Sequence, residues 1–292
     1  MKTKRFMYRL LLFTAAILWV DNVGAQRFSL PNEDGVTITY EIVGNQVEVV
    51  SDYQNTYRGT VSIPSDVTYD GKKYEVYSIG KLAFIYRDEL TSINLPNTIK
   101  RIGTGAFSEC SALATVKMSE AIEFIGERAF AECSLLESIT FPNTLLTIGK
   151  QAFYGCNRLT QIELPASLTF IGDISLACRN ITSVVSHIEE PFSTYAFGGG
   201  NTQPLTTATL CVPAGTKEKY LNTSGWEFAN IQEIIPLKGD VNDDGTVNVA
   251  DISSIITVMA NEENSVDADV NGDGVVDVAD IALVITIMAT SN

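Results

Sequence analysis

The chain has 292 residues, of which 45% are hydrophobic, and its formal net charge at pH 7 is −15. This length allows one long domain with a smaller one beside it, and the apolar content excludes wholesale disorder. The excess of acidic residues argues against non-specific binding to nucleic acid or to anionic membranes.

The first 25 residues have the pattern of an export signal. Four basic side chains precede an apolar run over 10–20, and small residues follow at 23–25, where a signal peptidase cuts. We therefore predict a Sec signal peptide that is cleaved after Ala25, and a secreted or cell-surface protein. The run is too short to span a bilayer, and no later stretch is long and apolar enough, so we expect no transmembrane segment in the mature chain.

Residues 26–60 contain the pattern of a β-hairpin. Apolar and polar residues alternate over 36–43 and 46–50, on both sides of Gly44-Asn45. Because the repeats that follow need a cover over their first coil, we interpret this segment as an N-terminal β cap.

Residues 61–185 repeat one motif at a fixed interval. An Ile-Gly pair begins at residues 79, 102, 125, 148 and 171, so that every step is 23 residues, and Ala-Phe follows in the first four copies. Such a fixed period predicts a solenoid, in which each unit buries its apolar edge only against its neighbours.

The unit over 113–133 shows what each part of the repeat is expected to do. It begins with a short strand and a polar turn at Ser119, where other copies have proline, which stops a strand. The glycine after isoleucine suits a tight or left-handed corner. We expect a short helical piece at 128–133 to return the chain, with its alanine small for close approach and its phenylalanine inside the coil.

Four of the five cysteines belong to the repeats. Cys110, Cys133 and Cys156 occupy the same place in successive units, and Cys178 lies one residue earlier. Exported chains often carry disulfides, but equivalent side chains of stacked coils point the same way, whereas a disulfide needs converging Cβ atoms. The spacing therefore favours a ladder of buried thiols over disulfides, and we expect Cys211 in the core as well.

The outward positions of the expected strands carry small polar or charged side chains. They are Ser92, Asn94, Thr115, Lys117, Ser138, Thr140, Gln161 and Glu163. No aromatic row occurs among them, so we expect no sugar-stacking platform on this face. The face is either merely soluble or a weakly marked protein-binding surface, because interfaces are usually rich in Tyr, Trp or Arg.

The sequence contains no pattern of a catalytic centre, so we predict a protein without enzymatic activity. His187 is the only histidine, and we expect it at an inward-facing structural position. No second histidine, activated serine or cysteine motif, or pair of acids at fixed spacing accompanies it. A Gly-rich phosphate loop is absent too.

Residues 186–237 leave the repeat register, and we interpret them as a C-terminal cap with Trp226 and Phe228 in its core.

From residue 238 the composition changes, because 238–292 hold eleven acids and a single base, Lys238. Two twelve-residue loops begin 29 residues apart, at Asp240 and Asp269, and each leads into an apolar helix, over 252–259 and 281–288, with no matching helix before it.

The two loops place oxygen atoms where a calcium ion needs them. Positions 1, 3, 5, 9 and 12 supply side-chain oxygens, position 7 a backbone carbonyl, and glycine at position 6 a sharp turn. Without a cation, these like charges would repel one another. Position 12 is aspartate rather than the glutamate of ordinary EF-hands. The candidate metal ligands are Asp240, Asn242, Asp244, Thr246, Asn248 and Asp251, and Asp269, Asn271, Asp273, Val275, Asp277 and Asp280.

The repeats carry a family resemblance. The pattern I-G-x-x-A-F-x-x-C-x-x-L-x-x-I-x-L-P over 61–185 resembles the BspA-like leucine-rich repeat of bacterial surface proteins. The resemblance implies an α/β solenoid that is curved and right-handed, with a parallel sheet on one side. It also implies an adhesion or protein-binding role without catalysis.

The loop-helix pairs over 238–290 resemble the type I dockerin domain. This implies a small all-α domain with two bound Ca²⁺ ions that docks onto a cohesin module of another protein. In this family, loop positions 10 and 11 help to choose the cohesin, and here they are Val249, Ala250, Val278 and Ala279. Cellulosomal dockerins usually have hydroxyl or charged residues there, so the cohesin class stays open, and docking onto the protein's own repeats is permitted. The combination of families leads us to expect an origin in Bacteroidetes.

We therefore expect a signal peptide at 1–25, an N-terminal β cap at 26–60, leucine-rich repeats at 61–185, a C-terminal cap at 186–237 and a type I dockerin domain at 238–292. The predicted function is a non-catalytic protein-binding module that a calcium-dependent dockerin attaches to a cohesin-bearing partner. A host or bacterial surface protein is the candidate ligand of the repeats. Two alternatives stay open: a structural spacer in a dockerin-assembled complex, and an accessory protein of polysaccharide degradation.

Overall fold

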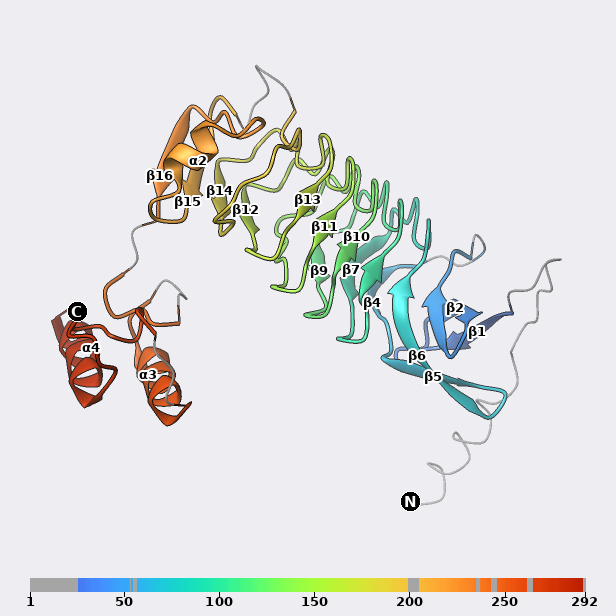
Figure 1. Cartoon of the computed structure of the whole chain (residues 1–292). Helices are drawn as coiled ribbons and strands as arrows, with labels where there is room; N and C mark the ends of the chain where they lie inside the picture. Colours follow the sequence, from blue (N-terminus) through green and yellow to red (C-terminus); the bar gives the residue numbers. More distant parts are fainter. Residues whose placement is uncertain are drawn as a thin grey trace. The chain divides into compact units, whose positions relative to one another are not determined.

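The computed structural model describes residues 26–52, 54, 57–198, 205–234, 237–242, 246–261 and 265–290. The expected signal peptide lies outside these residues. The chain forms two compact units, which divide between Glu233 and Ile234. The first unit is built mainly from strands and turns, and the second from two helices and their loops (Figure 1).

Most strands of the first unit are short, because each coil contributes only a few residues to a sheet. In chain order the elements are β1 (Arg27–Pro31), β2 (Thr37–Val43), β3 (Gln46–Val49), β4 (Gly59–Ser62), β5 (Asp66–Tyr69), β6 (Lys72–Ile79), β7 (Leu90–Asn94), β8 (Arg101–Ile102), β9 (Thr115–Lys117), β10 (Phe124–Ile125), β11 (Thr147–Ile148), β12 (Gln161–Leu164), β13 (Phe170–Ile171), β14 (Ser183–Ser186), β15 (Thr209–Val212), α2 (Lys217–Leu221) and β16 (Asn230–Glu233).

An antiparallel layer covers the first coil. β2 and β3 form the predicted hairpin, in which Val43 pairs with Gln46. Gly44 has a φ of 64°, which suits a two-residue turn. β1 adds to the outer side of β2, and β3 pairs in parallel with β6, so the hairpin continues into the sheet of the repeats. The N-terminal hairpin cap is therefore confirmed.

Two rows of parallel strands run along the stacked coils (Figure 1). The first row is β6-β8-β10-β11-β13, in which Ile102 pairs with Ile125 and Ile125 with Ile148. One 23-residue step therefore corresponds to one coil, as predicted. The second row consists of two sheets, β4-β7-β9 and β12-β14-β15-β16, because residues 137–141 form no strand at the corresponding place.

The segment after each Ile-Gly pair is a series of turns, so the helix expected at 128–133 is wrong. Arg128 and Glu132 have φ values of 54° and 61°, which are incompatible with a right-handed helix. Equivalent residues of other coils share this conformation: Leu82, Tyr86, Gly105, Glu109, Gln151, Gly155 and Ile174. Alternate N–H groups bond to the next coil instead, as from Phe130 to the carbonyl of Ala152 at 2.7 Å.

The glycine of each Ile-Gly pair allows close approach rather than a left-handed corner. The φ of Gly126 is not positive. A Cβ atom added to Gly126 would lie 2.7 Å from the carbonyl carbon of Gly103 in the preceding coil. The nearest backbone atoms to such a Cβ lie at 2.4–2.7 Å for all five of these glycines, Gly80, Gly103, Gly126, Gly149 and Gly172. The coils therefore touch through their backbones along this line.

Four phenylalanines stack in the interior of the coils. The rings of Phe84, Phe107, Phe130 and Phe153 follow one another with centroids 5.0–5.2 Å apart and planes within 10° of parallel. Leu176 occupies the corresponding place in the fifth coil and is also completely buried. The expected filling of each coil by phenylalanine is therefore confirmed.

The predicted thiol ladder is confirmed, because Cys110, Cys133, Cys156 and Cys178 are free and buried. Each thiol donates to the carbonyl of the phenylalanine in the preceding coil, with Sγ–O distances of 2.9–3.1 Å. Burial raises the pKa of the Cys110 and Cys178 thiols to about 12, and that of Cys133 and Cys156 well above its usual value. Cys211 is only half-buried, contrary to expectation.

These thiols are expected to resist labelling. Only a thiolate reacts with a disulfide reagent, and the raised pKa values keep the four ladder cysteines protonated at pH 8. In a native titration at pH 8, we expect Cys211 alone to react with Ellman's reagent, whereas all five cysteines react in denaturant. A second fast-reacting thiol in the native protein would contradict the buried ladder.

Two buried serines at different places of the repeat, Ser175 and Ser119, differ in their hydrogen bonds. Ser175 stands where the earlier copies have alanine, and its Oγ has no hydrogen-bond partner among the described residues although the side chain is 0% exposed. Ser119 is also 0% exposed, but its hydroxyl donates to the carbonyl of Ile99 at 2.8 Å. The two serines therefore form a matched pair.

Replacing Ser175 with alanine is expected to stabilise the solenoid. An unsatisfied buried hydroxyl costs about 1–3 kcal/mol, so Ser175→Ala should raise the free energy of unfolding by about 1 kcal/mol. Ser119→Ala should lower it by a similar amount, because the carbonyl of Ile99 loses its donor. Urea denaturation followed by circular dichroism measures both, and a loss of stability in Ser175→Ala would contradict the assignment.

The end of the first unit extends the second row beyond the repeats. β15 pairs in parallel with β14, and β16 with β15. Trp226 is completely buried, and its Nε1 donates to the carbonyl of Phe192 at 2.9 Å. The rings of Phe197 and Tyr220 pack edge-on against it. Trp226 and the buried Phe228 thus lie in the core, as expected.

The second unit consists of two loop-helix halves. α3 (Val249–Asn261) and α4 (Val278–Thr290) pack around a small core formed by Ile255, Ala268, Val270 and Val284. Both helices begin three residues earlier than expected, so loop positions 10 to 12 already form the first helical turn. Throughout the described part of the chain, the helices are too short or too polar to cross a lipid bilayer.

Candidate functional site

The second row of strands presents the polar face that the sequence predicts. Thr115, Lys117, Gln161 and Glu163 are exposed, and Ser92 is half-exposed. The hydroxyl of Thr115 donates to that of Ser92 at 2.8 Å, so neighbouring coils satisfy each other's polar groups. This face shows no convergent set of side chains that would mark a ligand.

His187 does not face inward, so this expectation is wrong. Alternation along β14 buries Val184 and Ser186, and the following residue therefore turns outward. The His187 side chain is 31% exposed, and its Nε2 lies 2.7 Å from Oε1 of Glu163. The histidine belongs to an exposed pair on the polar face.

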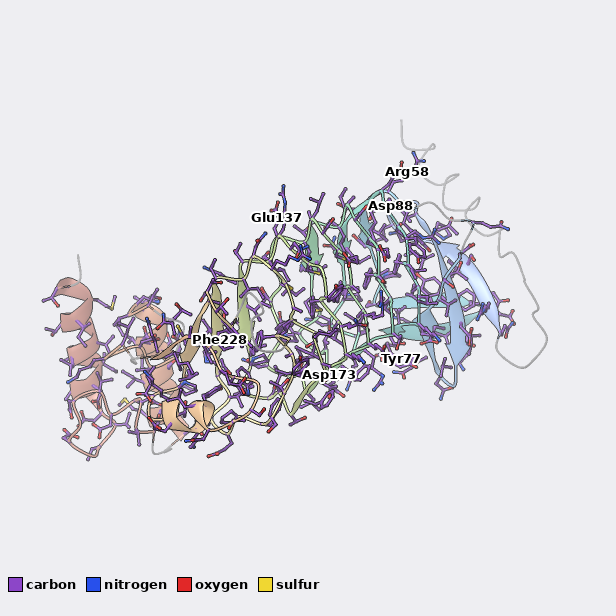
Figure 2. The ribbon with its side chains drawn as sticks, turned by 90° about the horizontal axis from the view of Figure 1, so that it is seen from above. Arg58, Tyr77, Asp88, Glu137, Asp173 and Phe228 are labelled. Atoms are coloured by element: carbon purple, nitrogen blue, oxygen red, sulfur yellow. The ribbon has the colours of Figure 1, made fainter. Side chains whose placement is uncertain are left out.

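Charges of both signs occur around the coils. Figure 2 shows Asp88 and Glu137 on one side of the stack and Asp173 on the opposite side. Ion pairs bridge neighbouring coils, as between Lys100 and Glu123 and between Arg158 and Glu137, both at 3.0 Å. Such exposed pairs contribute little to stability.

A more apolar surface lies along the first row, and sequence reasoning missed it. Phe170 and Leu146 are 53% and 44% exposed. The guanidinium of Arg101 lies 4.4 Å from the ring centre of Phe124. Arg101, Phe124 and Phe170 each directly precede an Ile-Gly pair, and reading the residues at that position would have identified this aromatic and arginine row.

The second loop of the C-terminal unit wraps around its own acidic side chains. Asp269 Oδ1 accepts hydrogen bonds from the N–H groups of Gly272 and Asp273, and its Oδ2 accepts one from Gly274, at 2.8–3.0 Å. Gly274, at position 6, has a φ of 88°, as the predicted sharp turn requires. Asn271 Oδ1 also accepts the N–H of Asp273 at 2.8 Å. The backbone thus gathers these oxygens on one side of the loop.

The aspartates at position 12 are buried and hold backbone groups. Asp251 and Asp280 are both 0% exposed. Asp280 Oδ2 accepts the N–H of Asp277 at 2.8 Å, and Asp251 Oδ2 accepts that of Asn248 at 2.7 Å. Their other oxygens accept N–H groups from positions 2 and 3 of the first loop and position 3 of the second.

The residues at position 9 cap the helices. Asp277 Oδ1 accepts the N–H of Ala279 at 2.6 Å, and Asn248 Oδ1 accepts that of Ala250 at 2.8 Å. Together with the acid three residues on, each forms a capping box. The sequence carries this signal as Asn or Asp followed by Asp before an apolar run, but sequence reasoning treated these residues only as metal ligands.

The donor set of the loops fits a hard cation. It contains carboxylate, side-chain amide and backbone carbonyl oxygens, and the two buried carboxylates share their segment with only one base, Lys238. Both oxygens of Asp280 accept one backbone N–H each, so each has a second lone pair for a cation. Within the described residues, no three His, Cys, Asp or Glu side chains converge as a metal cluster by themselves, and Asp244 lies outside these residues.

The candidate partner residues lie at the start of each helix. Val249 and Val278 are 67% and 69% exposed, and Ala250 and Ala279 are half-exposed and exposed. Ile256 and Ile285 follow seven residues later on the same sides of the helices, 52% and 51% exposed. Sequence reasoning missed these two isoleucines, which the helical spacing from position 10 could have identified.

Two family models match the chain. Residues 77–202 match the BspA type leucine rich repeat region in six copies, and residues 238–289 match the dockerin type I domain. No curated protein matches the chain. Both families are non-catalytic interaction modules typical of extracellular proteins, and type I dockerin domains generally bind calcium and pair with cohesin-type partners.

Solved structures of bacterial leucine-rich repeat proteins are similar to this chain. One from Bacteroides ovatus is 28% identical with a TM-score of 0.53, and the match covers 67% of this chain and 51% of that protein. The present chain thus spans about half of that protein's length. TpLRR of T. pallidum (19% identity, 70% and 94% coverage, TM-score 0.46) and a leucine rich cell surface protein of Faecalibacterium prausnitzii (22%, 75% and 55%, 0.48) are also similar.

Proposed function

We propose that this chain, which carries a BspA-type leucine-rich repeat region followed by a type I dockerin domain, is a non-catalytic, exported protein-binding module. The dockerin attaches it to a cohesin-bearing partner, and the repeats present a surface to a host or bacterial surface protein. The observation that supports this best is the pair of equivalent loop-helix halves. In each half, an exposed valine follows the loop residue whose side chain caps the helix.

Two Ca²⁺ ions are the proposed cofactors. Bound calcium supplies positive charge that offsets the repulsion between the loop carboxylates. Asp240, Asn242, Asp244, Asn248 and Asp251 in the first loop, and Asp269, Asn271, Asp273, Asp277 and Asp280 in the second, would hold the ions with their side chains, and Thr246 and Val275 with their backbone carbonyls.

The two helix starts are the proposed partner surface. Val249-Ala250 and Val278-Ala279 are chemically alike and similarly placed, so either half could face the partner. Neither helix carries a charged residue apart from the buried Asp251 and Asp280. A partner surface that is apolar, rather than one that pairs with charges, therefore fits this domain.

The repeats are proposed to bind protein through the row that contains Arg101, Phe124 and Phe170. Arginine and aromatic residues are enriched at protein interfaces, whereas the outward positions of β7, β9 and β12 in the second row are polar. A structural spacer is the alternative, in which the repeats only set a distance, and an accessory role in polysaccharide degradation is a further one.

Phe170→Ala distinguishes a binding role of the repeats from a spacer role. The variant should abolish a specific interaction of the repeats without changing the thermal midpoint of the solenoid.

The dockerin function is tested with the full mature chain on an array of cohesins. We expect capture by at least one cohesin in calcium and none in EDTA. The double variant Val249→Asp and Val278→Asp should lose at least ten-fold in affinity. Val266→Asp is the matched control, because Val266 is 90% exposed but belongs to the segment that connects α3 to α4. This variant should bind the cohesin as the wild type does. Binding of the double variant equal to that of the wild type would contradict the assigned surface.

A further inference from the structure

We infer that Asp251 and Asp280 are positioning residues, which fix the first turn of each helix and thereby present the valine and alanine at loop positions 10 and 11. Only the identity of the presented surface rests on the proposed function. The inference about the aspartates rests on their burial and hydrogen bonds.

The second half shows the geometry completely. Asp277 is the N-cap of α4, and its side chain accepts the N–H of Ala279 at 2.6 Å. Asp280 reaches back and accepts the N–H of Asp277 at 2.8 Å with Oδ2. The two residues between these groups are Val278 and Ala279, so reciprocal hydrogen bonds enclose the proposed partner residues.

The same carboxylate also joins the helix to the beginning of the loop. Asp280 Oδ1 accepts the N–H of Asn271, at loop position 3, at 3.0 Å. A single side chain therefore bonds to loop positions 3 and 9 while it forms part of the helix. Any closure of the loop around its acidic oxygens is transmitted to the first turn of α4 through this group.

The first half repeats the arrangement independently. Asp251 Oδ2 accepts the N–H of Asn248 at 2.7 Å, and Oδ1 accepts those of Val241 and Asn242 at 2.8 and 3.2 Å. Val241 packs against the core of the unit, so this carboxylate also anchors the loop to the packed helices. Two halves that differ in sequence elsewhere thus preserve one set of contacts.

The arrangement explains why position 12 is aspartate. The carboxylate is 0% exposed, and both oxygens accept backbone N–H groups, so a side chain longer by one methylene would displace these bonds. Ordinary EF-hand geometry gives the opposite expectation, because glutamate at position 12 provides a bidentate calcium ligand. Asp280→Glu therefore distinguishes a positioning role from a purely liganding one.

The test compares Asp280→Glu with the wild type in the full mature chain. At saturating calcium, hydrogen exchange measured by mass spectrometry should be at least ten-fold faster in peptides covering 277–281. Calorimetric titration with calcium should show at least ten-fold weaker binding to one site. Asp273→Asn is the matched control, because the Asp273 carboxylate accepts only loop groups, the N–H of Val275 and the amide of Asn271, and lies outside the helix. It should weaken calcium binding without faster exchange in 277–281 once calcium is saturating.

The inference would be overturned if Asp280→Glu bound calcium as tightly as the wild type and hydrogen exchange in 277–281 were unchanged. If Asp280→Glu does not fold, Asp280→Asn replaces it, since it keeps the size but loses one acceptor. Faster exchange at 277–281 then supports the inference, and unchanged exchange overturns it. No cohesin is needed for these measurements, so failure of the inference and failure of the proposed function are distinguishable.

Discussion

Replacing Gly126 with alanine is expected to destabilise the solenoid by about 3 kcal/mol, the upper part of the range for overpacking. The added Cβ would lie 2.7 Å from backbone atoms of Gly103 and Thr104, and neither coil can withdraw easily. Gly126 N–H bonds to the carbonyl of Ile102 at 2.8 Å, and Gly149 N–H to that of Ile125 at the same distance. Differential scanning calorimetry should show the midpoint of the first unit about 6–12 °C lower.

Glu127→Ala is the control for this experiment, because Glu127 is adjacent in sequence and exposed. It should change the free energy of unfolding by no more than about 0.5 kcal/mol. If Gly126→Ala were as stable as this control, the coils could not be in backbone contact along the glycine line.

Removing calcium is expected to unfold the C-terminal unit while the solenoid stays folded. A unit this small buries little apolar area, and among its described residues the core contains only four buried hydrophobic side chains, Ile255, Ala268, Val270 and Val284. Ligand binding adds about 4 kcal/mol per site when free calcium exceeds its dissociation constant a thousand-fold. In EDTA we expect the helical circular dichroism signal of α3 and α4 and the corresponding calorimetric transition to disappear.

The transition of the solenoid is the internal control, since no candidate calcium ligand lies in the repeats. It should keep its midpoint in EDTA, and excess calcium should restore the second transition. A trace that is the same with and without EDTA would show that the C-terminal unit is stable without the metal.

The architecture of the solenoid could be predicted because one physical constraint repeats at every coil. Ile102, Ile125 and Ile148 pair directly across coils, so the spacing in the sequence equals the register in the sheet. The turns at 128–133 could not be predicted in the same way. Arg128 and Glu132 adopt positive φ without being glycine, and their conformation results from hydrogen bonds to the next coil rather than from local preference.

The candidate calcium loops could be predicted from residue type and spacing, whereas the helix starts were placed three residues too late. The residues at positions 9 and 12 were interpreted only as metal ligands, although the same spacing of Asn or Asp and Asp before an apolar run is also a helix-capping signal. His187 was misplaced for a related reason. Its orientation depends on the phase of alternation in β14, and a shift of one residue reverses the face of every side chain.

The missing strand at 137–141 has a mechanical consequence for the proposed function, in which the dockerin holds one end of the molecule while the repeats bind a partner. Among the described residues, no backbone hydrogen bond joins 138–141 to an adjacent coil, whereas the first row of strands continues without a break through β13. At the coil that contains residues 137–141, a pulling force along the stack is therefore carried unevenly. Main-chain hydrogen bonds carry it on the side of the first row, and side-chain packing carries it on the side of the second row. Under tension, the coils on either side should separate first at this flank.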